Sequence, residues 1–225
     1  MKNIEETDLE VPAVRDLTAR IGRLLLAPEA TATIGEASRR AAAMVAERAA
    51  EASLLDIGYG FADSPFGPLM VAVTERGVIR VEYPDRDVDE ALEELAEAVS
   101  PRVLESPPAT EQARRELDEY FAGRLQRFEV PVDLSLRRGF GRKVLTATAR
   151  IPFGSVSTYR DVARRAGNPR AMRAAGNALS GNPIPILVPC HRVVRTGGGL
   201  GGYTGGLDRK ITLLRLEGVL QDNTE

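Results

Sequence analysis

The segment that decides the interpretation of this sequence is residues 181–194, GNPIPILVPCHRVV. Its prolines Pro183, Pro185 and Pro189 forbid a helix and predict a stiff, extended path. The apolar residues between the prolines predict that the segment is buried. It ends in Cys190 and His191, the only cysteine and the only histidine of the 225-residue chain.

The adjacent thiol and imidazole predict nucleophilic chemistry. A thiol attacks as the thiolate, and a neighbouring imidazole can lower its pKa or take its proton. Successive side chains of an extended chain point in opposite directions, so we expect a water or a bend between Cys190 and His191. Glu217, in the last predicted helix, is a candidate to orient the imidazole.

Two alternatives remain open for this pair. Cys190 would behave as a small buried hydrophobe and His191 as a satisfied core histidine if their role were structural. If the role is chemical, a Cys–His pair fits a hydrolase as well as a transferase. One cysteine and one histidine exclude an internal disulfide and a Cys/His zinc site, so we expect no metal.

Charge is divided unevenly along the chain. The whole sequence carries 30 Lys and Arg against 32 Asp and Glu. Residues 137–225 hold 15 basic and 5 acidic residues, a net of +10, which leaves 15 basic and 27 acidic residues, a net of −12, for 1–136. A basic half predicts a face that binds a polyanion, although a solvated charged surface gives the same pattern.

No apolar run approaches the length of a membrane span, which predicts that the protein has no membrane partner. The N-terminal residues MKNIEETDLE are acidic and lack the pattern of a signal peptide. We therefore expect a cytoplasmic protein.

Periodicity predicts an α+β chain in three parts. Residues 1–52 are expected to form a helical extension of unknown role. Residues 53–133 are expected to form a small α+β domain, and 134–225 a mostly helical domain that contains a helix-turn-helix. In the first of these domains we predict a three-stranded antiparallel meander and two helices. Their ranges are 54–62, 68–74 and 78–84 for the strands, and 87–100 and 109–123 for the helices.

The second domain is predicted to contain four helices, over 137–150, 159–167, 169–181 and 207–217. Thr158 is the expected N-cap of the second of these helices. The turn Gly167–Pro169 places Pro169 at the first position of the third helix. Two short helices joined by this tight turn form the predicted helix-turn-helix.

From about Leu54 to Val219 the sequence resembles the O6-alkylguanine-DNA alkyltransferases, also called methylated-DNA–protein-cysteine methyltransferases. The PCHRV core at 189–193 is highly specific for this family. The motifs that carry the resemblance occur in order: IPFGSVSTY (151–159), AGNPRAMRAAGNAL (166–179), GNPIPILVPCHRVV (181–194), GGYTGGLDRK (201–210) and LLRLEG (213–218).

The resemblance implies repair of DNA by direct reversal, in which the protein moves the alkyl group of O6-alkylguanine onto its own cysteine. It implies one transfer per molecule, a base flipped into the active site, and no cofactor. Cys190 matches the acceptor, His191 the base that acts through a water, and Glu217 the acid that holds the imidazole. Asn182 matches a residue that braces the turn before the site, and Tyr159 the donor to the departing guanine.

The resemblance also implies how double-stranded DNA is bound. The second helix of the helix-turn-helix enters the minor groove, and Arg173 fills the gap that the flipped base leaves. A monomer is expected. Small residues matching the close helix approach are Ala171, Ala174, Ala175 and Gly176. Residues matching the base pocket are Leu179, Val193, Tyr203 and Thr204, with carbonyls around Cys190 and Val193 reading the guanine amino group.

This sequence departs from the family pattern in three places. Met172 is bulkier than the small residue common at its position, which would weaken close contact with the minor groove. The segment GRKVLTATAR at 141–150 lacks the usual tryptophan. Thr204 stands where serine is frequent.

Three rival functions share some of these features. An alkyltransferase-like damage sensor binds lesions without reacting, but such proteins lack the cysteine. A cysteine hydrolase would turn over many times and needs an oxyanion hole, which the sequence does not reveal. A transcriptional regulator would fit the helix-turn-helix, but the chain has no second cysteine domain to act as its sensor.

Overall fold

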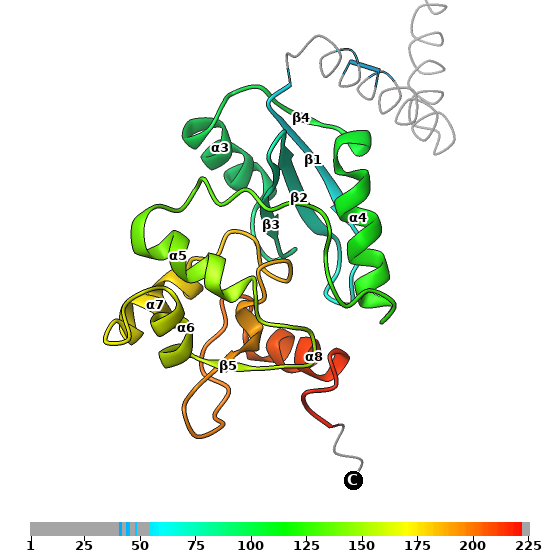
Figure 1. Ribbon diagram of the computed structural model, residues 1–225. Coiled ribbons are helices and arrows are strands. Elements are labelled where there is room, and N and C mark those ends of the chain that lie inside the picture. The colour runs from blue at the N-terminus through cyan, green and yellow to red at the C-terminus, as the bar shows by residue number, and fades with distance from the viewer. Residues whose placement is uncertain (1–40, 42–43, 46–47, 49–54, 222–225) are drawn as a thin grey trace, which may run out of the picture. The chain divides into compact units, whose positions relative to one another are not determined.

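The computed structural model describes residues 41, 44–45, 48 and 55–221 (Figure 1). The chain divides into two compact units, Met1–Val45 and Ala46–Glu225, and the second holds all the elements described below. Apart from residues 41, 44–45 and 48, which are helical, the predicted extension over 1–52 lies outside the described residues.

The predicted meander is confirmed by three antiparallel strands: β1 (Ile57–Ala62), β2 (Leu69–Thr74) and β3 (Gly77–Glu82). A fourth strand, β4 (Val103–Glu105), pairs in parallel with β1 and gives the sheet order β3-β2-β1-β4. Sequence analysis missed β4. It has only three residues, and none of them is buried, so no apolar alternation marks it.

Two helices contribute to the packing of the sheet (Figure 1). On β2, Met70 faces a cluster with Leu95 of α3 (Val88–Ala98), whereas Val71 joins the cluster that holds Leu117 of α4 (Pro107–Phe121). This alternation follows from the two-residue period of a strand. Because β2 is covered on both faces, its sequence is an apolar run rather than a polar–apolar alternation.

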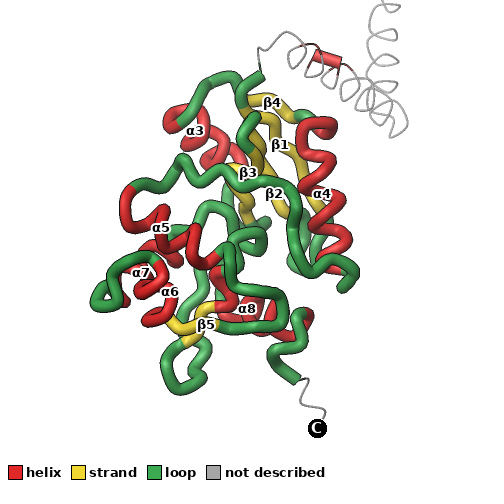
Figure 2. Tube along the Cα trace, in the orientation of Figure 1, coloured by secondary structure: helices red, strands yellow, loops and turns green. Residues whose placement is uncertain are grey.

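The helical part contains α5 (Gly139–Thr148), α6 (Tyr159–Arg165), α7 (Met172–Ser180) and α8 (Leu207–Leu216) (Figure 2). Longer loops precede α6 and α8, whereas α6 and α7 are joined by a short turn. The expected cap is present, since the Thr158 side chain accepts a hydrogen bond from the backbone N–H of Asp161 at 3.1 Å.

The predicted start of the third helix at Pro169 is wrong, because α7 begins at Met172. The side chain of Asn168 accepts a hydrogen bond from the N–H of Arg170 at 3.2 Å, and its carbonyl accepts one from Ala171 at 3.1 Å. These bonds hold 168–171 in a turn, as asparagine side chains commonly do.

The prediction of an extended path over 181–194 is also wrong. The side chain of Asn182 donates to the carbonyl of Val188 and accepts from the N–H of Ile184, which folds this stretch into a loop. Cys190–Arg192 then form a single 3-10 turn, followed by β6 (Val193–Val194), which pairs in parallel with β5 (Ser157–Thr158). The turn provides the bend between Cys190 and His191 that we had expected as one of two possibilities.

A single hydrophobic cluster joins the sheet to the helical part. It contains Val71 and Leu117 from the first part, and Leu145, Ile184 and Leu213 from the second. Within the described ranges, no helix is long and apolar enough to cross a bilayer, and His, Cys, Asp and Glu side chains form no group of three that could hold a metal ion.

Candidate active site

Cys190 lines a cavity of about 420 Å³ together with the first residue of α6, one side of α7 and the loop that precedes α8. The structure thus brings together most of the residues predicted for the reaction and for the base pocket. The lining residues are Tyr159, Gly176, Leu179, Ser180, Cys190, Arg195, Gly202, Tyr203 and Thr204.

Cys190 is 5% exposed, and its thiol lies against the side chain of Asn182. The Asn182 amide donates to Sγ at 3.1 Å and to the carbonyl of Val188 at 2.8 Å. Burial raises the pKa of Cys190 to about 11, although the Asn182 hydrogen bond and the charge of Lys210 act in the opposite direction. The resting thiol is therefore protonated at neutral pH, and its proton must leave as it attacks.

His191 is completely buried, and its Nε2 lies 2.8 Å from Oε1 of Glu217. Burial lowers the pKa of His191 and favours the neutral ring, although Glu217 opposes this shift. A carboxylate only accepts hydrogen bonds, so Nε2 carries the ring proton and donates a hydrogen bond to Glu217. The other nitrogen, Nδ1, is buried without a hydrogen-bond partner among the described residues. That nitrogen is therefore the basic atom of the ring.

Glu217 is anchored by more groups than the imidazole. Nε and a terminal nitrogen of Arg192 donate to its two oxygens, each at 2.8 Å. The hydroxyl of Tyr120 donates to Oε1 at 2.7 Å. Burial raises the pKa of Glu217, but the hydrogen bonds from His191 and Arg192 outweigh it and lower the pKa to about 2. The acid is therefore a fixed negative charge beside the imidazole.

Arg192 and Tyr120 were not predicted as site residues. Arg192 belongs to the PCHRV core, so the motif could have identified it as a site residue. Tyr120 lies 97 residues before Glu217, on α4, and no local pattern connects the two.

Lys210 is a third group that sequence reasoning missed. Its side chain is fully buried, and Nζ donates to the carbonyls of Val193 at 2.6 Å and Gly202 at 3.5 Å, and also to Leu200. Burial lowers the pKa of Lys210 to about 8, opposed by the nearby Cys190. The ammonium group thus ties together both ends of the loop that carries Arg195.

The structure does not place the Val193 side chain in the predicted base pocket. Val193 is fully buried in the core and is not among the residues that line the cavity. Its pairing with β5 turns the side chain into the hydrophobic cluster, while its carbonyl is engaged by Lys210.

The wall of the cavity is tied to the sheet through Tyr203. Its hydroxyl lies 2.7 Å from that of Tyr83, which follows β3, and the two rings meet edge to face with centroids 6.4 Å apart. Thr204 donates to the carbonyl of Ser180 at the end of α7 at 2.5 Å. These contacts fix the pocket residues relative to both parts of the protein.

Tyr159 is half-buried, and its hydroxyl donates to the carbonyl of Gly202 at 3.3 Å. Burial raises the pKa of this phenol, so it carries its proton at neutral pH, while Arg195 acts to lower it. Gly201 has a φ of +70°, and a Cβ there would lie 2.8 Å from the Tyr159 hydroxyl. Only glycine leaves room for the ring at this position.

The exposed side of helix α7 holds only some of the residues that were predicted to approach DNA. Arg173 and Ala174 are exposed and Ala171 is half-buried, but Ala175 is completely buried. Ala175 was expected among the small residues that allow a close approach to DNA, but the structure places it on the buried side of α7. The i, i+4 spacing places Ala175 with Leu179 on the side of α7 that packs in the core.

Two family models match the chain over nearly all of the region described above. The model of the 6-O-methylguanine DNA methyltransferase ribonuclease-like domain matches residues 57–134. The model of the 6-O-methylguanine DNA methyltransferase DNA binding domain matches residues 139–219.

Individual relatives agree with these models. The methylated-DNA–protein-cysteine methyltransferase of Methanosarcina acetivorans is 39% identical over 169 residues, which are 71% of this chain and 97% of that protein. The constitutive enzyme of the same name from Bacillus subtilis is 36% identical over 165 residues, 72% of this chain and 95% of that protein.

Solved structures lead to the same group. The Mycobacterium tuberculosis O6-methylguanine methyltransferase superposes with a TM-score of 0.63 at 34% identity, covering 74% of this chain and 96% of that one. Mycobacterium tuberculosis OGT in complex with DNA gives a TM-score of 0.62 at 36% identity, with 71% and 92% covered.

Proposed function

Because the chain belongs to the 6-O-methylguanine DNA methyltransferase family, we propose that Cys190 is the acceptor of a repair reaction that runs once per molecule. The protein is a methylated-DNA–protein-cysteine methyltransferase, which repairs DNA by moving the alkyl group of a flipped O6-alkylguanine to its own cysteine. The observation that carries the assignment is that Cys190 lines a cavity of about 420 Å³ and precedes an imidazole held by a buried carboxylate.

The proposed proton path begins at the Cys190 thiol. The proton passes through a water to Nδ1 of His191, the basic atom of the ring, and Glu217 stabilises the imidazolium that forms. The thiolate then attacks the alkyl carbon in line with the C–O6 bond. A C–S bond forms, the C–O6 bond breaks, and the electron pair stays with the guanine.

Tyr159 is the proposed donor to the departing base. It lines the cavity with Cys190, and its phenol carries a proton at neutral pH. Donation to O6 stabilises the negative charge that develops there as the C–O6 bond breaks. Asn182 is a positioning residue, since its amide fixes the sulfur and the turn that carries it.

The thioether product has no leaving group, so we expect one transfer per molecule. The added methyl group enters a site where Cys190 is already 5% exposed. Overpacking of this kind destabilises a fold by roughly 1–3 kcal/mol. The alkylated protein should therefore unfold more readily than the free protein.

The protein binds DNA, and a related protein, Mycobacterium tuberculosis OGT, has been solved in complex with DNA. We assign the contact to α7 in the minor groove, with Arg173 occupying the gap left by the flipped base. The small residues Ala171, Ala174 and Gly176 would let the helix approach the groove closely. Gly176 and Leu179 link this face to the cavity, since both line it.

The wider organisation is proposed on the same basis. Residues 53–133 would form the α+β domain and 134–225 the domain that binds DNA and accepts the alkyl group. The monomeric state and the cytoplasmic location stay predictions from the sequence.

The test is a count of transfers. A duplex with O6-methylguanine, in large excess over the protein, is incubated with it. Samples taken over time are digested, and the O6-methylguanine that remains is measured by chromatography. We expect loss of one equivalent per protein followed by a plateau, and no loss with Cys190→Ala. Continued loss beyond one equivalent would indicate a hydrolase that turns over, and would overturn the assignment of Cys190 as a terminal acceptor.

A further inference from the structure

Two cavities away from the active site adjoin one another on the helical part. The first, of about 610 Å³, lies between α5 and α6, which pack against each other. The second, also about 610 Å³, lies between the loop after α4 and the loop after α5. Arg150 lines both, and neither shares a lining residue with the cavity of Cys190.

Both cavities are lined by cations. Among the described residues, no carboxylate lines either one. We call the five exposed cations the basic track: Arg127, Arg142, Lys143, Arg150 and Arg165.

The cations of the basic track are left largely without counterions among the described residues. Within the described part of the chain, none of the five makes an ion pair. Asp161 of α6 pairs with Arg164 at 2.9 Å and accepts a hydrogen bond from Thr158 at 2.7 Å, while Arg165 acts on it through its charge without forming an ion pair. Adjacent cations without counterions repel one another, and an external polyanion relieves this repulsion.

We propose that the basic track binds the phosphate backbone of a second DNA duplex, separate from the stretch that α7 contacts. Cations that line two adjoining cavities and meet no carboxylate there suit a polyanion such as the phosphate backbone of DNA. The floor of the first groove is formed by small residues such as Ala147 and Ala166, which allow a backbone to approach closely. The proposal depends on the proposed function only in taking DNA as the polyanion.

The residues that line the two cavities indicate a second duplex rather than an extension of the duplex that α7 contacts. No residue of α7 lines either cavity among the described residues. The exposed side of α5 carries Arg142, Lys143 and Thr146, whereas Gly141 approaches Ala178 of α7. The track therefore belongs to a side of α5 that does not face α7. The protein would hold two duplexes at once while it searches for or repairs a lesion.

The experiment uses the full chain and two short duplexes with different fluorescent labels. One carries O6-methylguanine and the other is undamaged, and each is too short for two proteins to bind. Sedimentation measures how many duplexes of each colour travel with one protein. We expect a particle with one protein and both colours, which weakens steeply as salt rises.

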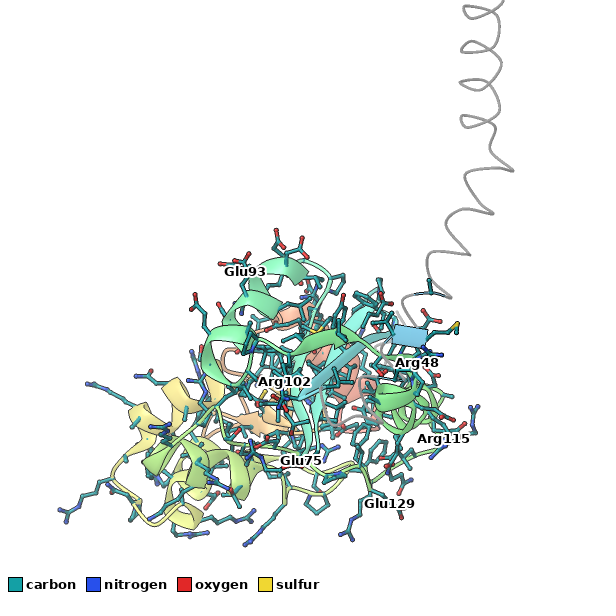
Figure 3. The ribbon with its side chains drawn as sticks, turned by 90° about the horizontal axis from the view of Figure 1, so that it is seen from above. Arg48, Glu75, Glu93, Arg102, Arg115 and Glu129 are labelled. Atoms are coloured by element: carbon teal, nitrogen blue, oxygen red, sulfur yellow. The ribbon has the colours of Figure 1, made fainter. Side chains whose placement is uncertain are left out.

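The variant that tests the track is Arg142→Glu combined with Arg165→Glu. We expect it to weaken binding of the second duplex about tenfold or more at 0.1 M salt. Its rate of methyl transfer from the short lesion duplex should stay within about twofold of wild type, because neither residue lines the active cavity. The matched control reverses one exposed arginine of α4, Arg115→Glu, which Figure 3 shows projecting from the surface.

Several outcomes would overturn the proposal. They are a wild-type particle with only one colour, a double variant that holds both colours as tightly as wild type, or equal loss in Arg115→Glu. A polyglutamate chain that displaces the second duplex better than unlabelled DNA would assign the track to acidic proteins instead. A two-colour particle without any methyl transfer would contradict the proposed function and leave the basic track supported.

Discussion

The carboxylate of Glu217 lies 2.8 Å from Nε2 of His191, and neither side chain has any exposed surface. The same carboxylate also accepts two hydrogen bonds from Arg192. A buried charge is stable only when it is paired and hydrogen-bonded. This cluster therefore holds the imidazole in one tautomer and, at the same time, anchors the end of α8 to the segment that carries Cys190.

Replacing Glu217 with glutamine should impair both stability and reaction. The change leaves the Arg192 guanidinium buried without its counterion, which costs roughly 3–5 kcal/mol. Urea denaturation measures this cost, and the rate of methyl transfer at saturating DNA measures the effect on chemistry. The control is Glu119→Gln, in an exposed pair with Arg124, which should resemble wild type. Equal stability of the two variants would show that the buried cluster does not hold the fold.

The same carboxylate makes stability depend on acid. The pKa of Glu217 is lowered from its ordinary value of 4.5 to about 2 in the folded protein. Its contribution is complete above about pH 4.5 and is lost as the pH falls from there toward 2. Melting temperatures of wild type and Glu217→Gln should therefore converge over this range. Parallel curves would contradict a carboxylate stabilised by its partners.

Removing the phenol of Tyr159 should slow the chemical step without weakening DNA binding. Tyr159→Phe keeps the ring between Gly176 and Gly201 but cannot donate to the departing base. Loss of a general acid lowers rates by roughly 10²-fold. Rapid-quench measurement of transfer from a saturated complex checks this. Tyr59→Phe, on β1, is the control and should react like wild type. A normal rate in Tyr159→Phe would remove the tyrosine from the mechanism.

Replacing Arg173 should slow methyl transfer only when the target base is in a duplex. Unpairing and unstacking a base costs a few kcal/mol, and the side chain that fills the gap offsets part of it. Arg173→Ala should slow transfer from a duplex by roughly tenfold or more. Transfer from a single-stranded oligonucleotide should be unchanged, because there is no stack to restore. An equal loss on both substrates would mean that Arg173 acts by general attraction to phosphate.

Much of the fold follows from local patterns in the sequence. Apolar runs separated by turn residues predict the meander, and Thr158 before Asp161 predicts the cap of α6. The start of α7 was not predictable from Pro169, because the hydrogen bonds of Asn168 compete with the helix over the next three residues. Strand β4 depends on its pairing with β1, which no pattern within its own three residues encodes.

The site shows the same division between local and distant information. Cys190, His191 and Glu217 could be proposed from motifs, and the structure joins Glu217 to His191, the residue that follows Cys190. Tyr83 and Tyr120 could not, because each reaches its partner from the other part of the chain. Lys210 lies within a quoted motif, but its role depends on three carbonyls that only the folded loop gathers around it.

The proposed function requires that DNA alkylates Cys190 covalently. The most direct measurement is the intact mass of the protein after titration with a duplex that carries one isotopically labelled O6-methylguanine, followed by peptide mapping. We expect a gain of one labelled methyl group per protein, located on Cys190 and absent in Cys190→Ala. Tight binding of the lesion with no gain in mass, or a methyl group on another residue, would contradict it.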